Sequence, residues 1–294
     1  MDAALFQEPR RRMIPLADGE MAAVEFGDPA RGVDVVFLHA NGFNAMTYRT
    51  LLGPLSFSMR ILALDLRGHG STRLPADPAE PRRSWSLFRK DLMAVLKTLP
   101  GPAPLLAGHS MGATVALMAA ADDPGCTRGL VLFEPVVLSP LADLMGRAPW
   151  TAGRSWRRIP LARNAARRRA VFDDPAEAFR SYEGRGAFRT WPSMVLADYL
   201  SGGLKERPDG KVELACDPAW EAANFAAQDN RAAGALRRLQ APAAIYRGDQ
   251  GSTCAVKRSF NPAIRVTTVA GASHFLPMEH PGLAREALLD AVEP

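Results

Sequence analysis

Ser110 is the residue of this sequence whose surroundings most favour catalytic chemistry. It lies between two glycines in Gly108-His109-Ser110-Met111-Gly112. The apolar run Leu105-Leu106-Ala107 precedes it, and an alanine-rich segment of helical composition follows. A tight strand-to-helix turn of this kind needs small flanking residues and leaves the serine Oγ exposed. The free N–H groups at the start of the helix point toward the same place. The pentapeptide alone is a weak signal, but its flanking strand and helix predict a nucleophilic serine.

Three further loops follow predicted strands, and together with the serine turn they make the sequence resemble the α/β-hydrolase family from about Met13 to the C-terminus. These loops are His39-Ala40-Asn41-Gly42-Phe43, Asp65-Leu66-Arg67-Gly68-His69-Gly70-Ser71 and Gly271-Ala272-Ser273-His274-Phe275. The first is similar to the family's HG-type oxyanion loop, with Ala40 in place of the usual glycine. The second is similar to its D-x-R-G-x-G-x-S loop, and the third to its histidine loop. The resemblance implies a serine-nucleophile hydrolase, because dehalogenases and epoxide hydrolases of the family use an aspartate.

A serine hydroxyl is a poor nucleophile at neutral pH and needs a base within hydrogen-bond reach. The resemblance implies that His274 is this base, and that backbone N–H groups of Met111 and Asn41 stabilise the oxyanion. In the alternative interpretation Ser110 is a small turn residue. The histidines of the first two loops are expected to be structural, as are Asp65 and Arg67, and His109 adjoins the serine too closely to reach back to it.

The acid that orients the histidine has two candidates. The family usually carries it three residues beyond a glycine, after the strand that follows the cap, but three residues beyond Gly248 stands Gly251, which has no side chain. Asp249 is the nearby carboxylate. Family members with the acid elsewhere carry it at the end of the strand after the nucleophile helix, where Glu134 stands in this sequence. We favour Glu134 over Asp249 as this acid. In the alternative, Glu134 only caps a loop, and a reshaped loop lets Asp249 reach His274.

The elements that must position these loops alternate along the chain. Short apolar runs bounded by turn residues predict strands, and amphipathic or alanine-rich segments predict helices. Strands are expected at 13–17, 20–26, 33–38, 61–64, 104–107, 130–133, 243–246 and 264–269, and the clearest helices at 84–99, 112–122 and 281–292. Asp18-Gly19 suits a tight hairpin turn. The pattern predicts an α/β fold, here an α/β-hydrolase fold, with a mostly parallel sheet flanked by helices.

The alternation stops between the strand ending near Phe133 and about residue 230. This stretch has helical composition and no convincing strand, so we expect a helical cap at 135–230 and a core formed by 1–134 and 231–294. Eight arginines and no acid lie between Arg147 and Arg169. They predict a solvated helix face, with a lid that attracts anions as the alternative. Aromatic residues of the cap, Trp150, Trp156, Phe188 and Trp191, either line a pocket or pack within the cap.

Composition excludes several classes of protein. With 294 residues, 47% hydrophobic and 23% charged, the chain is an ordinary globular one. No apolar run has the length of a membrane span, and the N-terminus does not have the order of a secretion signal, so a cytoplasmic location without stable membrane insertion is expected. The net charge of +5 is not accompanied by a nucleic-acid-binding motif. The three widely spaced cysteines indicate reduced thiols, and neither a metal nor an organic cofactor is expected.

The sequence therefore predicts an esterase, lactonase or lipase-like enzyme that cleaves a small-molecule ester through an acyl-enzyme. Carbon–carbon bond hydrolases and cofactor-free perhydrolases keep the same serine and are alternatives within the family. A protein that binds a small molecule on a hydrolase scaffold, with little catalysis, is the alternative from another class, because fold does not fix function. The oligomeric state is left open.

Overall fold

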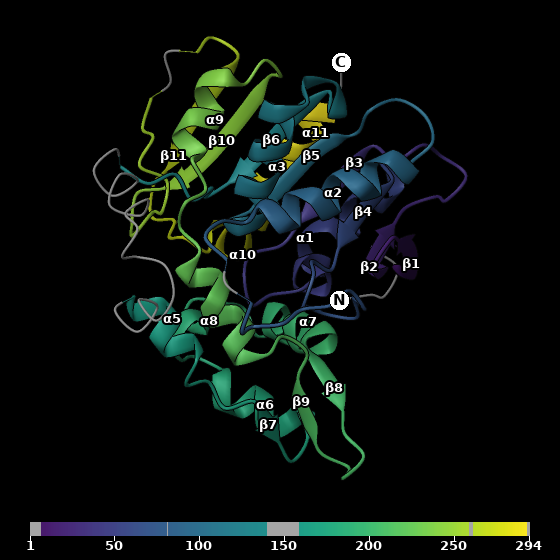
Figure 1. Cartoon of the computed structure of the whole chain (residues 1–294), viewed down its shortest axis with the longest axis vertical. Coiled ribbons are helices and arrows are strands. Elements are labelled where there is room, and N and C mark those ends of the chain that lie inside the picture. The colour runs from purple at the N-terminus through teal and green to yellow at the C-terminus, as the bar shows by residue number, and fades with distance from the viewer. Residues whose placement is uncertain (1–6, 81, 140–158, 259–260, 293–294) are drawn as a thin grey trace.

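The computed structural model describes residues 7–80, 82–139, 159–258 and 261–292. Eight strands form one sheet at its centre (Figure 1). Their spatial order is β1 (Arg10–Leu16), β2 (Gly19–Phe26), β4 (Ile61–Leu64), β3 (Val35–Leu38), β5 (Leu105–His109), β6 (Gly129–Phe133), β10 (Ala243–Gly248) and β11 (Ile264–Val269). From β4 to β11 neighbouring strands are parallel, whereas β1 and β2 form an antiparallel hairpin that joins β4 at the edge. The predicted α/β-hydrolase fold with a mostly parallel sheet is confirmed.

Helices cover both faces of this sheet, which is why its central strands have no polar side. On one face lie α2 (Ser86–Thr98), α3 (Met111–Asp122) and α9 (Ala232–Arg238). On the other lie α1 (Arg49–Leu52), α10 (Leu276–Glu279) and α11 (Pro281–Val292). Each face buries its own apolar cluster. Because parallel strands all end at one edge of a sheet, the loops after β3, β4, β5, β6, β10 and β11 converge there.

The described residues 159–226, between β6 and α9, lie beyond this edge, in the lower half of Figure 1. Their helices are α5 (Pro160–Ala165), α6 (Pro175–Tyr182), α7 (Ser193–Gly203) and α8 (Pro218–Ala226). The expectation that this stretch contains no strand is wrong. A small antiparallel sheet forms there from β7 (Val171–Phe172), β9 (Val212–Leu214) and β8 (Leu204–Glu206). Strands of two or three residues are too short to produce a recognisable alternation of apolar and polar side chains.

Candidate functional site

Ser110 lies on the turn between β5 and α3, and its backbone is strained. Its φ of 54° and ψ of −114° fall in a region that side chains other than glycine rarely adopt. The turn packs tightly against β3: a Cβ atom at Gly108 or Gly112 would contact the backbone carbonyl oxygen of Leu38. The two glycines of the motif are therefore required by the close approach of the turn and the start of α3 to the end of β3, and that approach holds the serine at the end of the sheet.

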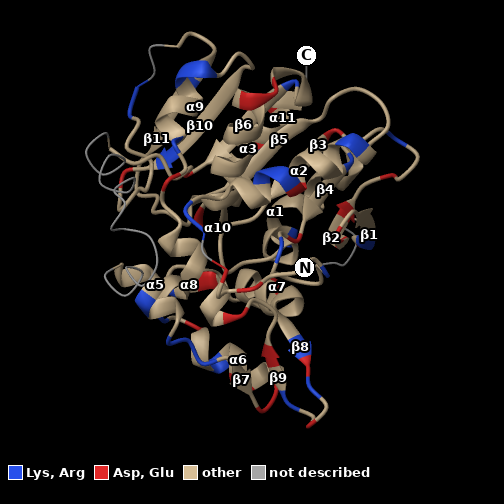
Figure 2. Ribbon diagram, viewed as in Figure 1, with Lys and Arg blue, Asp and Glu red and all other residues tan. Residues whose placement is uncertain are grey.

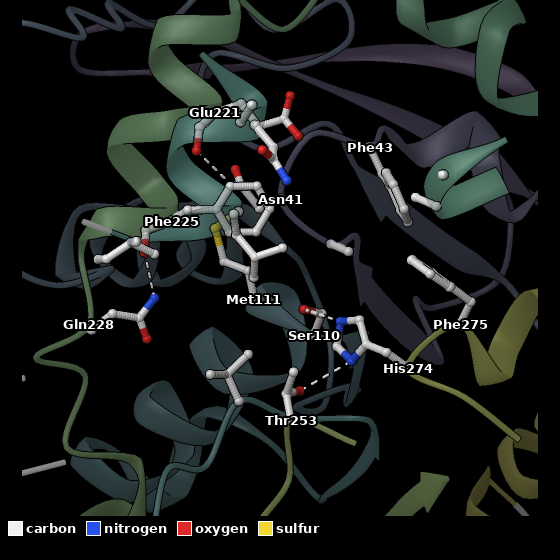
Figure 3. Close-up of a pocket in the computed structure, with 18 of the residues that line it drawn as sticks. Asn41, Phe43, Ser110, Met111, Glu221, Phe225, Gln228, Thr253, His274 and Phe275 are labelled. Carbon is white, nitrogen blue, oxygen red and sulfur yellow. Dashed lines mark hydrogen bonds between the residues drawn. The ribbon is translucent and has the colours of Figure 1, made fainter. Parts of the chain in front are cut away.

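The loop after β11 carries His274, and its imidazole faces the serine (Figure 3). His274 Nε2 is 3.0 Å from Ser110 Oγ. This distance is within hydrogen-bond range and is the contact that a general base needs. Two sequence-predicted residues that are 164 positions apart thus meet at the carboxyl edge of the sheet.

Glu134, directly after β6, lies on the opposite side of the imidazole. Its side chain is fully buried, and its Oε2 is 3.2 Å from His274 Nδ1. Its carboxylate also accepts hydrogen bonds from the N–H of Gly248 (2.5 Å), the hydroxyl of Ser252 (2.7 Å) and the N–H of Thr253 (3.0 Å). Burial alone would raise the pKa of Glu134, but the hydrogen bonds from His274, Ser252 and Gly248 outweigh it and lower the pKa below the ordinary value. The carboxylate is therefore held in its charged form.

The other candidate acid, Asp249, lies apart from the imidazole in this structure. It is exposed, and its Oδ1 accepts a hydrogen bond of 3.0 Å from the backbone N–H of Gly271. The loop after β10 instead supplies donors to Glu134. Thr253 Oγ1 is also 3.2 Å from His274 Nδ1, as the dashed line in Figure 3 marks. The sequence did not single out Ser252 and Thr253, because small hydroxyl residues in a loop resemble ordinary turn residues. The one indication that this loop has another role was the glycine, Gly251, at the position where the family usually carries its acid.

The two residues predicted to supply oxyanion donors line the same cavity as the serine. Met111 is the first residue of α3, where a backbone N–H has no acceptor within its own helix. Asn41 lies in the loop after β3, and its side chain is bonded to α8: Nδ2 donates to the carbonyl of Glu221 (2.9 Å), and Oδ1 accepts from Asn224 (3.1 Å). Asn41 and Met111 both line the cavity described next. The side-chain bonds of Asn41 leave its backbone N–H as the group that could meet an oxyanion.

A cavity of about 830 Å³ lies beside Ser110 and His274. Its wall is mainly apolar, with side chains from the core and from the segment between β6 and α9. These include Phe43, Trp85, Val136, Val137, Ile159, Leu161, Phe188, Phe225 and Phe275. Trp191 packs instead against Phe43 and Phe188, and Trp150 and Trp156 lie outside the described residues. The size and lining fit an apolar small molecule.

Two charged residues that line the cavity, Arg168 and Glu221, form a partly buried ion pair. Arg168 Nη1 is 2.5 Å from Glu221 Oε2, and its Nη2 donates to the hydroxyl groups of Tyr199 (2.7 Å) and Tyr182 (3.2 Å). Arg168 belongs to the predicted arginine cluster, of which 147–158 lie outside the described residues. Of the others, Arg169 pairs with Glu177, and basic and acidic residues lie close together around α5 and α6 (Figure 2). The described part of the cluster is therefore partly neutralised.

The remaining sequence-predicted residues brace the loops around the site. Arg67 binds Asp91 through two hydrogen bonds of 2.8 and 2.7 Å, and Asp65 accepts from the N–H groups of Ala45 and Ser71. In the described part of the chain, no group of three or more His, Cys, Asp or Glu side chains could hold a metal ion. Over the same residues, no helix is long and apolar enough to cross a bilayer.

Comparison with known proteins agrees with this architecture. The model of the alpha/beta hydrolase family matches residues 35–287. A 2-(acetamidomethylene)succinate hydrolase from Mesorhizobium japonicum is 24% identical over 88% of this chain and 87% of its own length. A solved structure of E-2-(acetamidomethylene)succinate hydrolase superposes with a TM-score of 0.79 at 21% identity, covering 97% of this chain and 100% of that one. A pimeloyl-[acyl-carrier protein] methyl ester esterase from Methylococcus capsulatus is 36% identical over 35% of this chain and 37% of its own length.

Proposed function

Because the chain belongs to the alpha/beta hydrolase family, we propose that it is a serine hydrolase that cleaves carboxylic ester-type bonds through an acyl-enzyme. One observation carries the proposal: Ser110, His274 and Glu134 lie in hydrogen-bond contact, in that order, beside an apolar cavity. We assign residues 1–134 and 231–294 to the catalytic core and 135–230 to a cap that completes the cavity.

The first half-reaction transfers the acyl group to the serine. Ser110 Oγ attacks the substrate carbonyl carbon while His274 Nε2 takes the hydroxyl proton. The carbonyl oxygen becomes an oxyanion between the backbone N–H groups of Met111 and Asn41. When the tetrahedral adduct collapses, the bond to the alkoxide oxygen breaks, and His274 returns its proton to that oxygen. An alcohol leaves, and the acyl group stays on Ser110.

The second half-reaction repeats these steps with water. Water attacks the acyl carbon and gives a proton to His274, which returns it to Ser110 Oγ as the carboxylic acid leaves. Glu134 accepts a hydrogen bond from His274 Nδ1–H in both halves. It thereby fixes the tautomer with Nε2 free to accept a proton and stabilises the imidazolium that forms. The hydrogen bonds that lower the pKa of Glu134 keep it able to do so.

The cavity supports a moderately apolar acyl group, as in an esterase, lactonase or lipase-like reaction. Proteins of several activities are similar to this chain, among them a haloalkane dehalogenase from Mesorhizobium japonicum that is 30% identical over 43% of this chain and 39% of its own length. Ser110 argues against that chemistry here. Carbon–carbon bond hydrolysis, perhydrolysis and simple ligand binding are the alternatives that an experiment must separate.

Labelling with a fluorophosphonate probe, combined with turnover of p-nitrophenyl esters of increasing acyl length, tests the proposal. We expect covalent label on Ser110, no label on Ser110→Ala, and ester turnover that disappears in the same variant. A protein that neither takes the label nor turns over any ester would instead support the binding protein. Labelling without ester turnover would favour the carbon–carbon hydrolase or the perhydrolase.

A further inference from the structure

The backbone of the loop after β3 is held by side chains on either side of Asn41. The N–H of Ala40 donates to the hydroxyl of Tyr48 (3.1 Å), and the N–H of Gly42 donates to His69 Nε2 (3.0 Å). The N–H of Asn41 lies between these two tethered groups. Its position relative to Ser110 therefore depends on Tyr48 and His69, neither of which lines the cavity.

From Tyr48 a chain of hydrogen bonds continues to the histidine loop. The Tyr48 hydroxyl is 2.8 Å from His109 Nδ1, and His109 Nε2 is 2.7 Å from the backbone carbonyl oxygen of His274. That oxygen can only accept, so His109 carries its proton on Nε2. Burial lowers the pKa of His109 to about 3, so the ring is neutral and its Nδ1 accepts from Tyr48. The directions of all three hydrogen bonds follow.

This chain is sealed from solvent and passes next to the nucleophile. Tyr48 is 1% exposed, and His109 is fully buried and covalently joined to Ser110. If one of these side chains loses its hydrogen-bonding group, bulk water cannot take its place. The backbone group that was bonded to it, the N–H of Ala40 or the carbonyl of His274, must then shift to find another partner. The two loops that move would be those carrying the proposed oxyanion donor and the proposed base.

Building on the proposed function, we propose that Tyr48 and His109 are positioning residues that hold the Asn41 loop and the His274 loop at fixed distances from Ser110. Neither touches substrate. They act by keeping the oxyanion donor and the base in one geometry, and a displacement of about 1 Å at a reacting centre can lower a rate on the order of a hundredfold.

Tyr48→Phe tests the link at the Asn41 loop, and Tyr246→Phe is its matched control. Tyr246 is also a buried tyrosine of the core, and no hydrogen bond of its hydroxyl is found among the described residues. We expect Tyr48→Phe to lower kcat for a p-nitrophenyl ester about tenfold, with KM within about twofold of wild type, and to weaken a boronic acid inhibitor that mimics the tetrahedral adduct about as much. Tyr246→Phe should leave all three unchanged. A purely structural role would lower Tm while leaving kcat and boronate affinity of the folded protein intact.

Two conservative variants test the two hydrogen bonds of His109 separately. In His109→Gln an amide nitrogen replaces Nε2 and can still donate to the His274 carbonyl, whereas in His109→Asn an amide oxygen replaces Nδ1 and can still accept from Tyr48. Each breaks one link, so we expect each to lower kcat about tenfold. Adding Tyr48→Phe to His109→Gln should lower kcat by less than the product of the two single effects, because both remove the same hydrogen bond.

The outcome separates this inference from the proposed function. Wild-type protein that fails to take the fluorophosphonate label contradicts the proposed function itself. Labelled wild type, with kcat and boronate affinity of Tyr48→Phe equal to those of Tyr246→Phe, overturns the positioning role alone. Where Tyr48→Phe does not fold, the His109 variants decide: wild-type kcat in both of them overturns the inference.

Discussion

At the scale of single residues, backbone strain is concentrated at the proposed catalytic centre. Among the described residues, three that are not glycine have a positive φ: Ser110, Glu134 and Arg231. A left-handed conformation at such a residue costs on the order of 1–3 kcal/mol and persists only where surrounding contacts enforce it. At Ser110 the contact is with β3, and at Glu134 it is the set of donors from the loop after β10. Both distortions direct a side chain at the same imidazole.

Replacing the two candidate acids separately tests which one orients His274. In Glu134→Gln an amide can donate to Nδ1 and favour the wrong tautomer, so we expect kcat to fall by roughly three to four orders of magnitude. Asp249→Asn should change kcat modestly, because Asp249 contacts Gly271 instead. Ester turnover measures the rates, and circular dichroism shows whether both variants are folded. A larger loss in Asp249→Asn would assign the role to Asp249.

At the scale of elements, buried parallel strands were the easiest part of the structure to predict. Ile61–Leu64 has the predicted bounds, because a continuous apolar run between turn residues has few other interpretations. The edge strand Ile264–Val269 also has its predicted bounds, although Arg265 and Thr268 in it are exposed. The strands β7, β8 and β9 could not be predicted, since their pairing is decided by contacts within the segment between β6 and α9. The order of the loops around the site was predictable for the same reason as the strands. The hydrogen bonds of Thr253 with His274 and of Tyr48 with His109 could not be predicted, because they depend on which loops and side chains meet in the folded protein.

The close packing of α3 on β3 predicts a large difference between two glycines. Gly112→Ala places a Cβ against the backbone of Leu38 and His39, so we expect it to lower the free energy of unfolding by about 1–3 kcal/mol or more. Gly282→Ala, in α11, has open space around the added Cβ and no positive φ. It should be neutral or stabilising by about 0.4–1 kcal/mol. Urea unfolding of both variants measures the difference, and equal effects would contradict the close approach of α3 to β3.

At the scale of the whole molecule, the carboxyl edge of the sheet buries an unusual number of neutral histidines. His39, His69 and His109 are each at most 1% exposed. Burial lowers the pKa of all three, to about 4 in His69 and about 3 in His109, with neighbouring histidines adding to the effect in His39 and His109. Each ring donates from one nitrogen to a carbonyl oxygen and accepts through the other, which only a neutral ring can do. The loops around the site are therefore built on groups that bind a proton below about pH 6.5 in the unfolded chain.

This burial makes the stability of the fold depend on pH in a defined direction. Below about pH 6.5 an unfolded histidine binds a proton, whereas His109 in the folded protein stays neutral until the pH approaches 3. The unfolded state therefore binds more protons, and the free energy of unfolding decreases as the pH falls through this window, by up to about 1.4 kcal/mol per pH unit for each such histidine. Glu134, whose pKa is lowered, contributes stability that is present above the unfolded-chain value of about 4.3 and is lost as the pH falls from there through its folded-state value.

Urea unfolding of wild type and His109→Gln between about pH 4.5 and pH 6 isolates the contribution of one ring, because glutamine does not titrate. We expect the variant to be less stable at pH 7 but to lose stability more slowly on acidification, with a slope smaller by close to one proton. Equal slopes would mean that His109 binds a proton without unfolding, and that its Nδ1 does not accept from Tyr48.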